Sequence, residues 1–178
     1  QRIDQMIDPE LTFQMAVDDY RRQGYSDKWI NERMRSIEMR KELTDEWHRA
    51  GITEQRDFAI LTNVLTQAWS GMTTGEYKHH KGLTKENLRD NMTNVELALN
   101  TLAEVTATEI SRQRNPQGMA QSRQTAKEGG EVARNARADI ESRLGHSVIS
   151  SERASDHIRP IEERSKAEEL PFEGKDDI

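Results

Sequence analysis

Histidines are the residues in this sequence whose type would most readily bind a metal or carry a proton. His79 and His80 are adjacent, so on a helix they point about 100° apart and cannot hold one ion as an i, i+4 pair does. His48, His146 and His157 have no histidine or carboxylate at a ligand spacing. We therefore interpret the histidines as solvent-facing and predict that the protein uses no metal or other cofactor.

Residues for covalent or phosphate-transfer chemistry are also missing. The sequence contains no cysteine, and no serine lies in the glycine-flanked elbow that exposes a nucleophile. The glycine-containing segments 71–75 and 129–130 lack the spacing and the Gly-Lys-Ser/Thr of a phosphate-binding loop. Acidic pairs such as Asp18 and Asp19 are typical of a solvated surface. We predict that the chain is not an enzyme.

A group of basic residues between 78 and 89 could contact nucleic acid. Its members are Lys78, His79, His80, Lys81, Lys85 and Arg89. The N-termini of short helices predicted to begin at Thr73 and Thr84 would add backbone N–H donors for phosphate. A solvated basic face would give the same pattern, and the net charge of −6 argues against tight, nonspecific binding of duplex DNA by the whole chain. Direct nucleic-acid binding is therefore our alternative hypothesis.

Composition predicts an all-α fold. Hydrophobic residues make up 33% of the chain and charged residues another 33%, which suits a helical domain with a large solvated surface. No apolar run approaches the roughly 20 residues of a membrane-spanning helix. Acidic residues near the start, Asp4 and Asp8, interrupt any signal peptide. We predict a cytoplasmic protein without membrane contact.

Capping residues and glycines predict a compact domain of about five to seven helices. The expected ranges are 8–23, 26–49, 53–70, 73–81, 93–114 and 119–144, with a brief turn at 84–89. The first has its apolar side at Leu11, Met15, Val17 and Tyr20. The helix at 53–70 is apolar around much of its circumference, which predicts a central position. The helix at 93–114 has the clearest apolar stripe, formed by Val95, Ala98, Leu99, Leu102, Val105, Thr106 and Ile110.

Two of these helices have apolar sides that a single chain would cover poorly. The helix at 26–49 is apolar on two opposite sides, and without Gly or Pro we expect it to continue unbroken between two layers. The helix at 119–144 has a stripe of small residues that permits close helix approach. We therefore predict a homodimer or larger assembly. Its predicted interface residues are Trp29, Ile30, Met34, Ile37, Ala126, Gly130, Ala133 and Ile140.

Domain organisation follows from where the apolar periodicity ends. Residues 1–150 form one predicted helical domain, and residues 151–178 form a polar, acidic tail that we expect to be mobile. The tail is either a solubilising terminus or a segment that mimics nucleic acid or occupies a basic groove on a partner. The segment that begins at Gln1 reads like the middle of a chain, so we expect a further domain before it.

Several segments in combination resemble the C-terminal region of bacterial BRO-family proteins, often described as phage antirepressors, and the DNA-damage-inducible protein D group. The segments are residues 57–63 (DFAILTN), 81–93 (KGLTKENLRDNMT) followed by Glu96 and Leu97, 8–11 (DPEL), 40–47 (RKELTDEW), and 129–130 leading to Ala133 and Arg134. The resemblance covers nearly the whole chain to about Ser151. Over that length it is closer to the antirepressors.

The resemblance implies a non-enzymatic regulatory module for self-association and partner binding. In such proteins a DNA-binding BRO domain precedes this region, so DNA would be contacted through that domain. Antirepressors sequester a prophage repressor, whereas DNA-damage-inducible protein D is associated with disassembling RecA filaments. The expected partners are therefore a second copy of the chain and either a phage repressor or RecA, and modulation of RecA filaments is a further alternative function.

Overall fold

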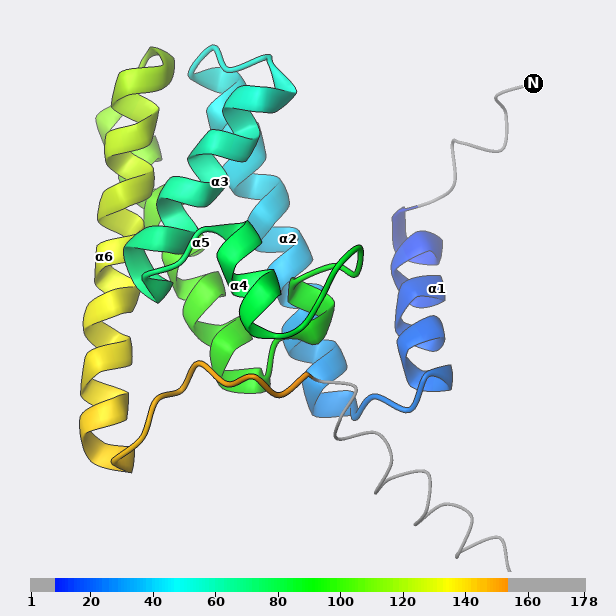
Figure 1. The fold of residues 1–178 in the computed structure, drawn as a ribbon. Coiled ribbons are helices and arrows are strands. Elements are labelled where there is room, and N and C mark those ends of the chain that lie inside the picture. The colour runs from blue at the N-terminus through cyan, green and yellow to red at the C-terminus, as the bar shows by residue number, and fades with distance from the viewer. Residues whose placement is uncertain (1–8, 154–178) are drawn as a thin grey trace, which may run out of the picture.

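The computed structural model describes residues 9–153, and this part of the chain is built of α-helices (Figure 1). The elements are α1 (Pro9–Arg22), α2 (Asp27–Arg49), α3 (Gln55–Ser70), α4 (Thr74–His80), a 3-10 turn η2 (Arg89–Asn91), α5 (Asn94–Arg114) and α6 (Gly118–Leu144). No strand occurs between residues 9 and 153. The predicted all-α fold is confirmed. The predicted N-cap at Asp8 and the acidic residues beyond 153 lie outside the described residues.

The helix ends lie where the local sequence predicts them. The Ser26 side chain accepts a hydrogen bond from the backbone N–H of Trp29, which caps α2. Thr93 and Glu96 form the predicted capping box at the start of α5. Gly71 and Gly145 follow α3 and α6 with φ values of +79° and +77°, a left-handed conformation that glycine adopts without a steric penalty. Only at 84–89 is a predicted element wrong, because the 3-10 turn begins at residue 89.

Helix α2 runs without a break, as predicted, and most residues of its two apolar sides are buried. Ile30 and Met34 are buried near its start, and Leu43 and Trp47 near its end. The Arg40 guanidinium lies 5.0 Å from the centre of the Trp47 ring. The helix packs mainly against α5 and, at its beginning, against α1.

The central helix of the fold is α5 and not α3, which corrects the prediction for 53–70. Helix α5 packs against α6, α2 and α3, whereas α3 packs mainly against α6. Figure 1 shows α3 at the front of the molecule, with α5 behind it. On α3 the side chains of Ala59 and Gln67 are exposed, and Phe58 and Ile60 are only partly buried. A helix that is apolar around much of its circumference, such as α3, contacts several neighbours, but it need not lie at the centre of the fold.

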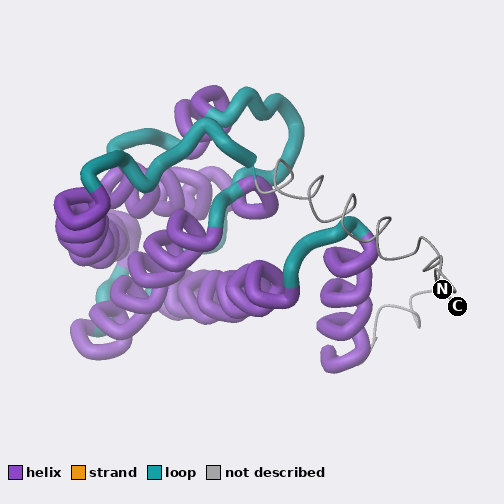
Figure 2. Tube along the Cα trace, turned by 90° about the horizontal axis from the view of Figure 1, so that it is seen from below, coloured by secondary structure: helices purple, strands orange, loops and turns teal. Residues whose placement is uncertain are grey.

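Helix α1 stands apart from the other helices (Figure 2). Tyr20 packs against the core, and its hydroxyl donates a hydrogen bond of 2.7 Å to Asp90 Oδ1. Leu11 and Met15, predicted to lie on the packing side, are 54% and 56% exposed. Within residues 9–153, only the second half of the predicted apolar side of α1, Val17 and Tyr20, therefore packs against the core.

The segment after α6 runs across the lower part of the molecule, below α4 (Figure 1). Val148 and Ile149 are buried. Lys81 Nζ, at the end of α4, donates a hydrogen bond of 2.9 Å to the carbonyl oxygen of Ser150. Arg153 Nε donates one of 3.1 Å to the carbonyl oxygen of Lys81. Ser150 and Arg153 thus hold this segment against the end of α4.

Candidate interaction face

Part of the predicted apolar stripe of α5 faces outward, whereas Leu99 of the same stripe is 3% exposed and lies in the core. Val95 is 40% exposed and Leu102 is 37% exposed, and Ala98 between them is exposed as well. An amphipathic helix normally turns such a stripe toward the core of its own domain. Here the outward part of the stripe forms a ridge on the surface.

A second apolar ridge on α6 lies beside this one. Val132, Ala136, Ile140 and Leu144 repeat every fourth residue, so they follow one side of the helix. Val132 is 43% exposed and Leu144 is 53% exposed. The two helices are joined by a short loop and packed together, so the beginning of α5 lies beside the end of α6.

The two ridges border an apolar hollow of about 440 Å³. Its walls include Val95, Ala98 and Leu102 from α5 and Ala136 and Ile140 from α6. We call the exposed surface formed by Val95, Ala98, Leu102, Val132, Ile140 and Leu144 the α5–α6 face. Of these residues, only Ile140 was predicted to lie at an interface.

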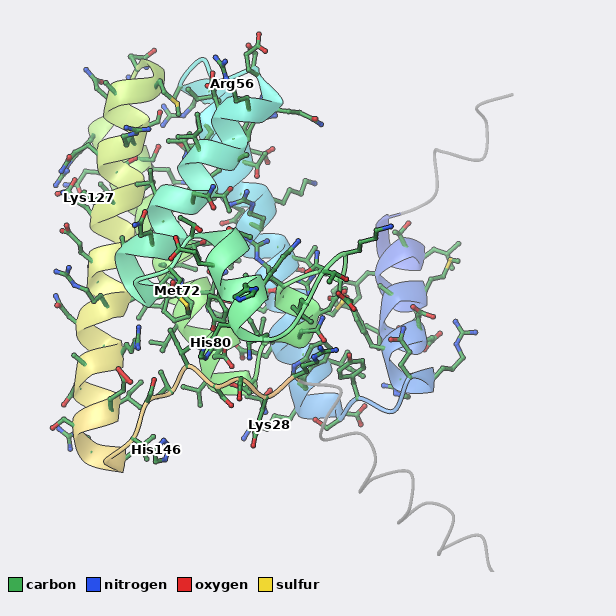
Figure 3. The ribbon with its side chains drawn as sticks, in the orientation of Figure 1. Lys28, Arg56, Met72, His80, Lys127 and His146 are labelled. Carbon is green, nitrogen blue, oxygen red and sulfur yellow. The ribbon has the colours of Figure 1, made fainter. Side chains whose placement is uncertain are left out.

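Charged residues of both signs from α2 border the α5–α6 face. Lys28 and Glu32 line the hollow. Glu32 and Arg35 line a shallower depression that continues along α5 past Leu102. Lys28 and His146, labelled in Figure 3, mark the lower end of α2 and the turn after α6. The apolar surface therefore has a polar border, the arrangement typical of protein-binding surfaces.

The opposite side of α5 explains why part of its apolar stripe faces outward. This side carries polar residues at a spacing of three or four, and each of them is at most 2% exposed: Glu96, Asn100, Glu104, Thr108 and Ser111. Buried polar groups are stable only when they are hydrogen-bonded. A partner for each must therefore come from the surrounding elements or from α5 itself.

Four surrounding elements supply most of these partners. The hydrogen bonds run from Lys81 Nζ to Glu96 Oε1 (2.8 Å), from Trp69 Nε1 to Asn100 Oδ1 (3.1 Å), from Arg89 Nη2 to Glu104 Oε1 (2.6 Å) and from Ser111 Oγ to Glu46 Oε2 (3.0 Å). The Thr108 hydroxyl instead donates to the carbonyl oxygen of Glu104 within α5. Turning α5 to bury Val95 and Leu102 would break these tertiary hydrogen bonds and expose Leu97 and Ala103, so both kinds of contact oppose that rotation.

The small-residue stripe of α6 packs within the chain. Ala126, Gly130 and Ala133 are buried, and α6 lies against both α3 and α5. A Cβ at Gly130 would lie 2.5 Å from the Cβ of Ala68. The prediction of close helix approach is confirmed. The assignment of these three residues to an interface between chains is corrected, because α3 and α5 already cover them.

The predicted interface residues of α2 are also mostly buried in their own chain. Trp29, Ile30 and Met34 are at most 5% exposed, and Trp29 Nε1 donates a hydrogen bond of 3.0 Å to the carbonyl oxygen of Met92. Trp29 also stacks on Tyr25, with ring centres 4.1 Å apart. Ile37 is 39% exposed. Of the four residues predicted on α2, only Ile37 is available on the surface.

The predicted basic cluster is divided by the fold. His79, His80 and Lys85 are exposed, and His80 is labelled in Figure 3. The Lys81 side chain is 0% exposed. It is held by Glu96 and by the segment after α6, so it cannot contact nucleic acid; this corrects the prediction. Lys78 and Arg89, each partly buried, line a separate polar pocket between α3, α4 and α5.

All three tyrosines of the chain have raised pKa values. Burial, followed by a hydrogen bond to Asp90, raises the pKa of Tyr20 to about 12. Burial and then the negative charge of Asp90 raise the pKa of Tyr25. Burial and then the charge of Glu96 raise the pKa of Tyr77. The folded chain thus keeps these protons at a pH where the unfolded chain loses them.

We therefore predict that stability falls as the pH rises above the ordinary tyrosine pKa of about 10. The stabilisation is fully present below that pH, and Tyr77 accounts for a loss of up to about 1.4 kcal/mol per pH unit above it. Urea unfolding at a series of pH values measures the slope, and Tyr77→Phe should reduce it. If tyrosinate absorbance appeared at the ordinary pH while the chain remained folded, the prediction would be wrong.

Neither a metal-binding cluster nor a membrane-spanning helix is found among the described residues. Between residues 9 and 153, no three His, Asp or Glu side chains are grouped so that they could hold a metal ion. None of the helices in this range is long and apolar enough to cross a membrane.

Comparison with known proteins identifies the domain. Residues 24–156 match the DinD C-terminal domain, that of DNA-damage-inducible protein D. The match includes α2 to α6 and both of the segments 57–63 and 81–93, whereas α1 precedes it. Neither the curated proteins nor the solved structures gave a match. The antirepressor resemblance is not tested by this match and stays a prediction. Because the match covers well over half of its length, the chain belongs to the DinD C-terminal domain family.

Proposed function

We propose that this chain is a non-enzymatic regulatory module that dimerises through the α5–α6 face. The observation that supports this proposal is the apolar hollow of about 440 Å³ between two exposed apolar ridges. Monomeric proteins rarely leave a continuous apolar surface of this kind uncovered.

The spacing of the ridge residues suits a partner helix. Val95, Ala98, Leu102 and Val105 follow one another at three and four residues, the spacing of positions that pack as knobs into holes. The α6 ridge runs alongside. In a dimer with two-fold symmetry, α5 and α6 of one chain would pack against the same two helices of the other. The result would be a four-helix arrangement with both ridges covered.

The border of the face favours a second copy as the partner. A two-fold interface brings a surface against itself, so it needs charges of both signs near its edge. Lys28 and Arg35 supply positive charge, and Glu32 lies between them on α2. A partner surface that carried charge of one sign would be repelled either by Lys28 and Arg35 or by Glu32.

Leu102→Glu tests the proposal. We expect the wild-type chain to sediment at twice its mass of 20.5 kDa at micromolar concentration, and the variant at 20.5 kDa. Burying a leucine stabilises by about 1.5–3 kcal/mol, and a two-fold interface contains Leu102 twice. The dissociation constant should therefore rise by about 100-fold or more. Because Leu102 is exposed in one chain, the thermal stability of the monomer should hardly change.

Ile37→Glu is the matched control. It places the same charge at an exposed apolar residue of α2 outside the α5–α6 face, and we expect it to leave the dimer intact. A wild-type mass of 20.5 kDa would contradict the proposal. Dissociation by Ile37→Glu with no effect of Leu102→Glu would move the interface to α2.

We further propose that the dimer acts on a protein of the DNA-damage response, with RecA as the first candidate. Family membership supports this step, because the matched domain is that of a DNA-damage-inducible protein. Purified RecA filaments on single-stranded DNA, incubated with the wild-type chain, should shorten or dissociate more quickly than without it. An unchanged filament lifetime would contradict RecA as the partner and leave a phage repressor as the next candidate.

A further inference from the structure

A second cavity lies away from the α5–α6 face. Most of the side chains that line it are polar, whereas most of those that line the hollow on the α5–α6 face are apolar. It has a volume of about 180 Å³ and is enclosed by α3, α4, the segment before η2 and the beginning of α5. We call it the threonine pocket, because Thr62, Thr66 and Thr74 line it together with Lys78, Asn87 and Arg89. No aspartate or glutamate lines it. A cavity of this size exceeds what a single water molecule requires.

The threonine pocket contains hydrogen-bond donors without acceptors. Among residues 9–153, the Lys78 ammonium has no carboxylate partner, and the hydroxyl groups of Thr66 and Thr74 donate no hydrogen bond. The side-chain oxygen of Asn87 accepts from the backbone N–H groups of Arg89 and Asp90, which leaves its amide NH₂ group without an acceptor in this part of the chain. Donors of this kind, arranged around one cavity, would be satisfied by a ligand rich in acceptor oxygens.

Positive charge is in excess beside the threonine pocket. Arg89 Nη2 lies 2.6 Å and Arg40 Nη1 3.9 Å from Glu104 Oε1, so two guanidinium groups share one buried carboxylate. Burial and then repulsion by Arg89 lower the pKa of Arg40 to about 10, and Glu104 offsets only part of this. Arg40 also donates a hydrogen bond to the Thr62 hydroxyl in the pocket wall. Lys78 adds a third cation in the pocket wall, which no aspartate or glutamate lines.

We propose that the threonine pocket binds a phosphate group, either free phosphate or the phosphate of a nucleotide. A phosphate offers several acceptor oxygens and negative charge, which match the unused hydroxyl, amide and ammonium donors and the excess cations. The pocket is distinct from the α5–α6 face and is independent of dimer formation.

Titration of the full-length, ¹⁵N-labelled chain with inorganic phosphate at constant ionic strength tests the site. We expect saturable shifts of the backbone amide signals of Thr66, Thr74 and Lys78. The amide of Lys127, which lies on the outside of α6 away from the pocket (Figure 3), should stay unchanged. Shifts that failed to saturate, or that were equally large at Lys127, would overturn the proposal.

Lys78→Gln and Lys85→Gln form a matched pair. Both remove one positive charge from the same region, but Lys85 is exposed and does not line the pocket. We expect Lys78→Gln to weaken phosphate binding by about tenfold or more, because it removes a charge-assisted hydrogen bond. Lys85→Gln should weaken binding less than twofold. Equal losses would mean diffuse attraction and would refute a defined site.

Two further titrations distinguish the sources of the phosphate. Thymidine 5′-monophosphate and a short single-stranded oligonucleotide are compared with inorganic phosphate on the same signals. Tighter binding of the oligonucleotide, lost in Lys78→Gln, assigns the pocket to nucleic acid. Equal binding of all three assigns it to a small phosphate ligand. No saturable shift with any of the three contradicts the proposal.

Discussion

Replacing Lys81 with methionine should lower the free energy of unfolding by about 3–5 kcal/mol, because it leaves the charge of Glu96 buried without its partner. Lys81 Nζ lies 2.8 Å from Glu96 Oε1, and both side chains are 0% exposed. The same ammonium donates a hydrogen bond to the carbonyl oxygen of Ser150. The substitution therefore also releases the segment after α6.

Urea unfolding measures this loss, and two further variants define its cause. In the double variant Lys81→Met/Glu96→Gln the buried charge is gone, so we expect a smaller loss than in Lys81→Met alone. Lys85→Met changes an exposed lysine of the same segment and should stay within about 0.5 kcal/mol of the wild type. A loss below about 1 kcal/mol for Lys81→Met would show that water reaches Glu96 and that the charge is not buried.

The burial of Lys81 against Glu96 could not be predicted from the sequence. In the sequence, Lys81 is one of six basic residues within twelve positions, and nothing marks it as different from Lys78 or Lys85. Its acceptor, Glu96, belongs to the capping box of the next long helix. Only the packing of α4 on α5 brings the two together.

Gly130→Ala should destabilise the chain although alanine is the better helix former. A Cβ at this position would lie 2.5 Å from the Cβ of Ala68 and 2.7 Å from the carbonyl oxygen of Leu65. Both atoms belong to α3, which would have to move away from α6. Overpacking costs up to about 3 kcal/mol, which exceeds the gain of about 1 kcal/mol from helix propensity. We expect a net loss of about 2 kcal/mol in urea unfolding.

Gly129→Ala should behave in the same way against α5, and Gly75→Ala is the control for both. The added Cβ at Gly129 would lie 2.7 Å from the backbone N of Ala107 and the carbonyl oxygen of Ala103. At Gly75, in α4, a Cβ would meet nothing within 4 Å. That variant should be neutral or more stable by up to about 1 kcal/mol. If all three variants were stabilising, the close packing of α6 would be refuted.

The local sequence was sufficient to predict the helices and most of their ends. Ser26, Thr93, Gly71 and Gly145 cap or end helices through hydrogen bonds and backbone conformations that involve only residues a few positions away. Because these interactions are local, the ends of a helix can be predicted from the residues next to them. The close approach of α6 to its neighbours was also predicted from the sequence, because it depends on the small size of the side chains along one side of the helix.

The side of α5 that faces the core depends on contacts between residues that are far apart in the sequence. On α5, Val95 and Leu102 of the predicted apolar stripe are exposed, whereas Leu99 of the same stripe is buried together with the polar residues Glu96 and Glu104. The partners of that polar side, Lys81 and Arg89 among them, lie on separate elements. A hydrophobic pattern assumes that polar groups remain in water, which fails when distant residues satisfy them in the core. For the same reason the α5–α6 face could be identified only from the folded chain.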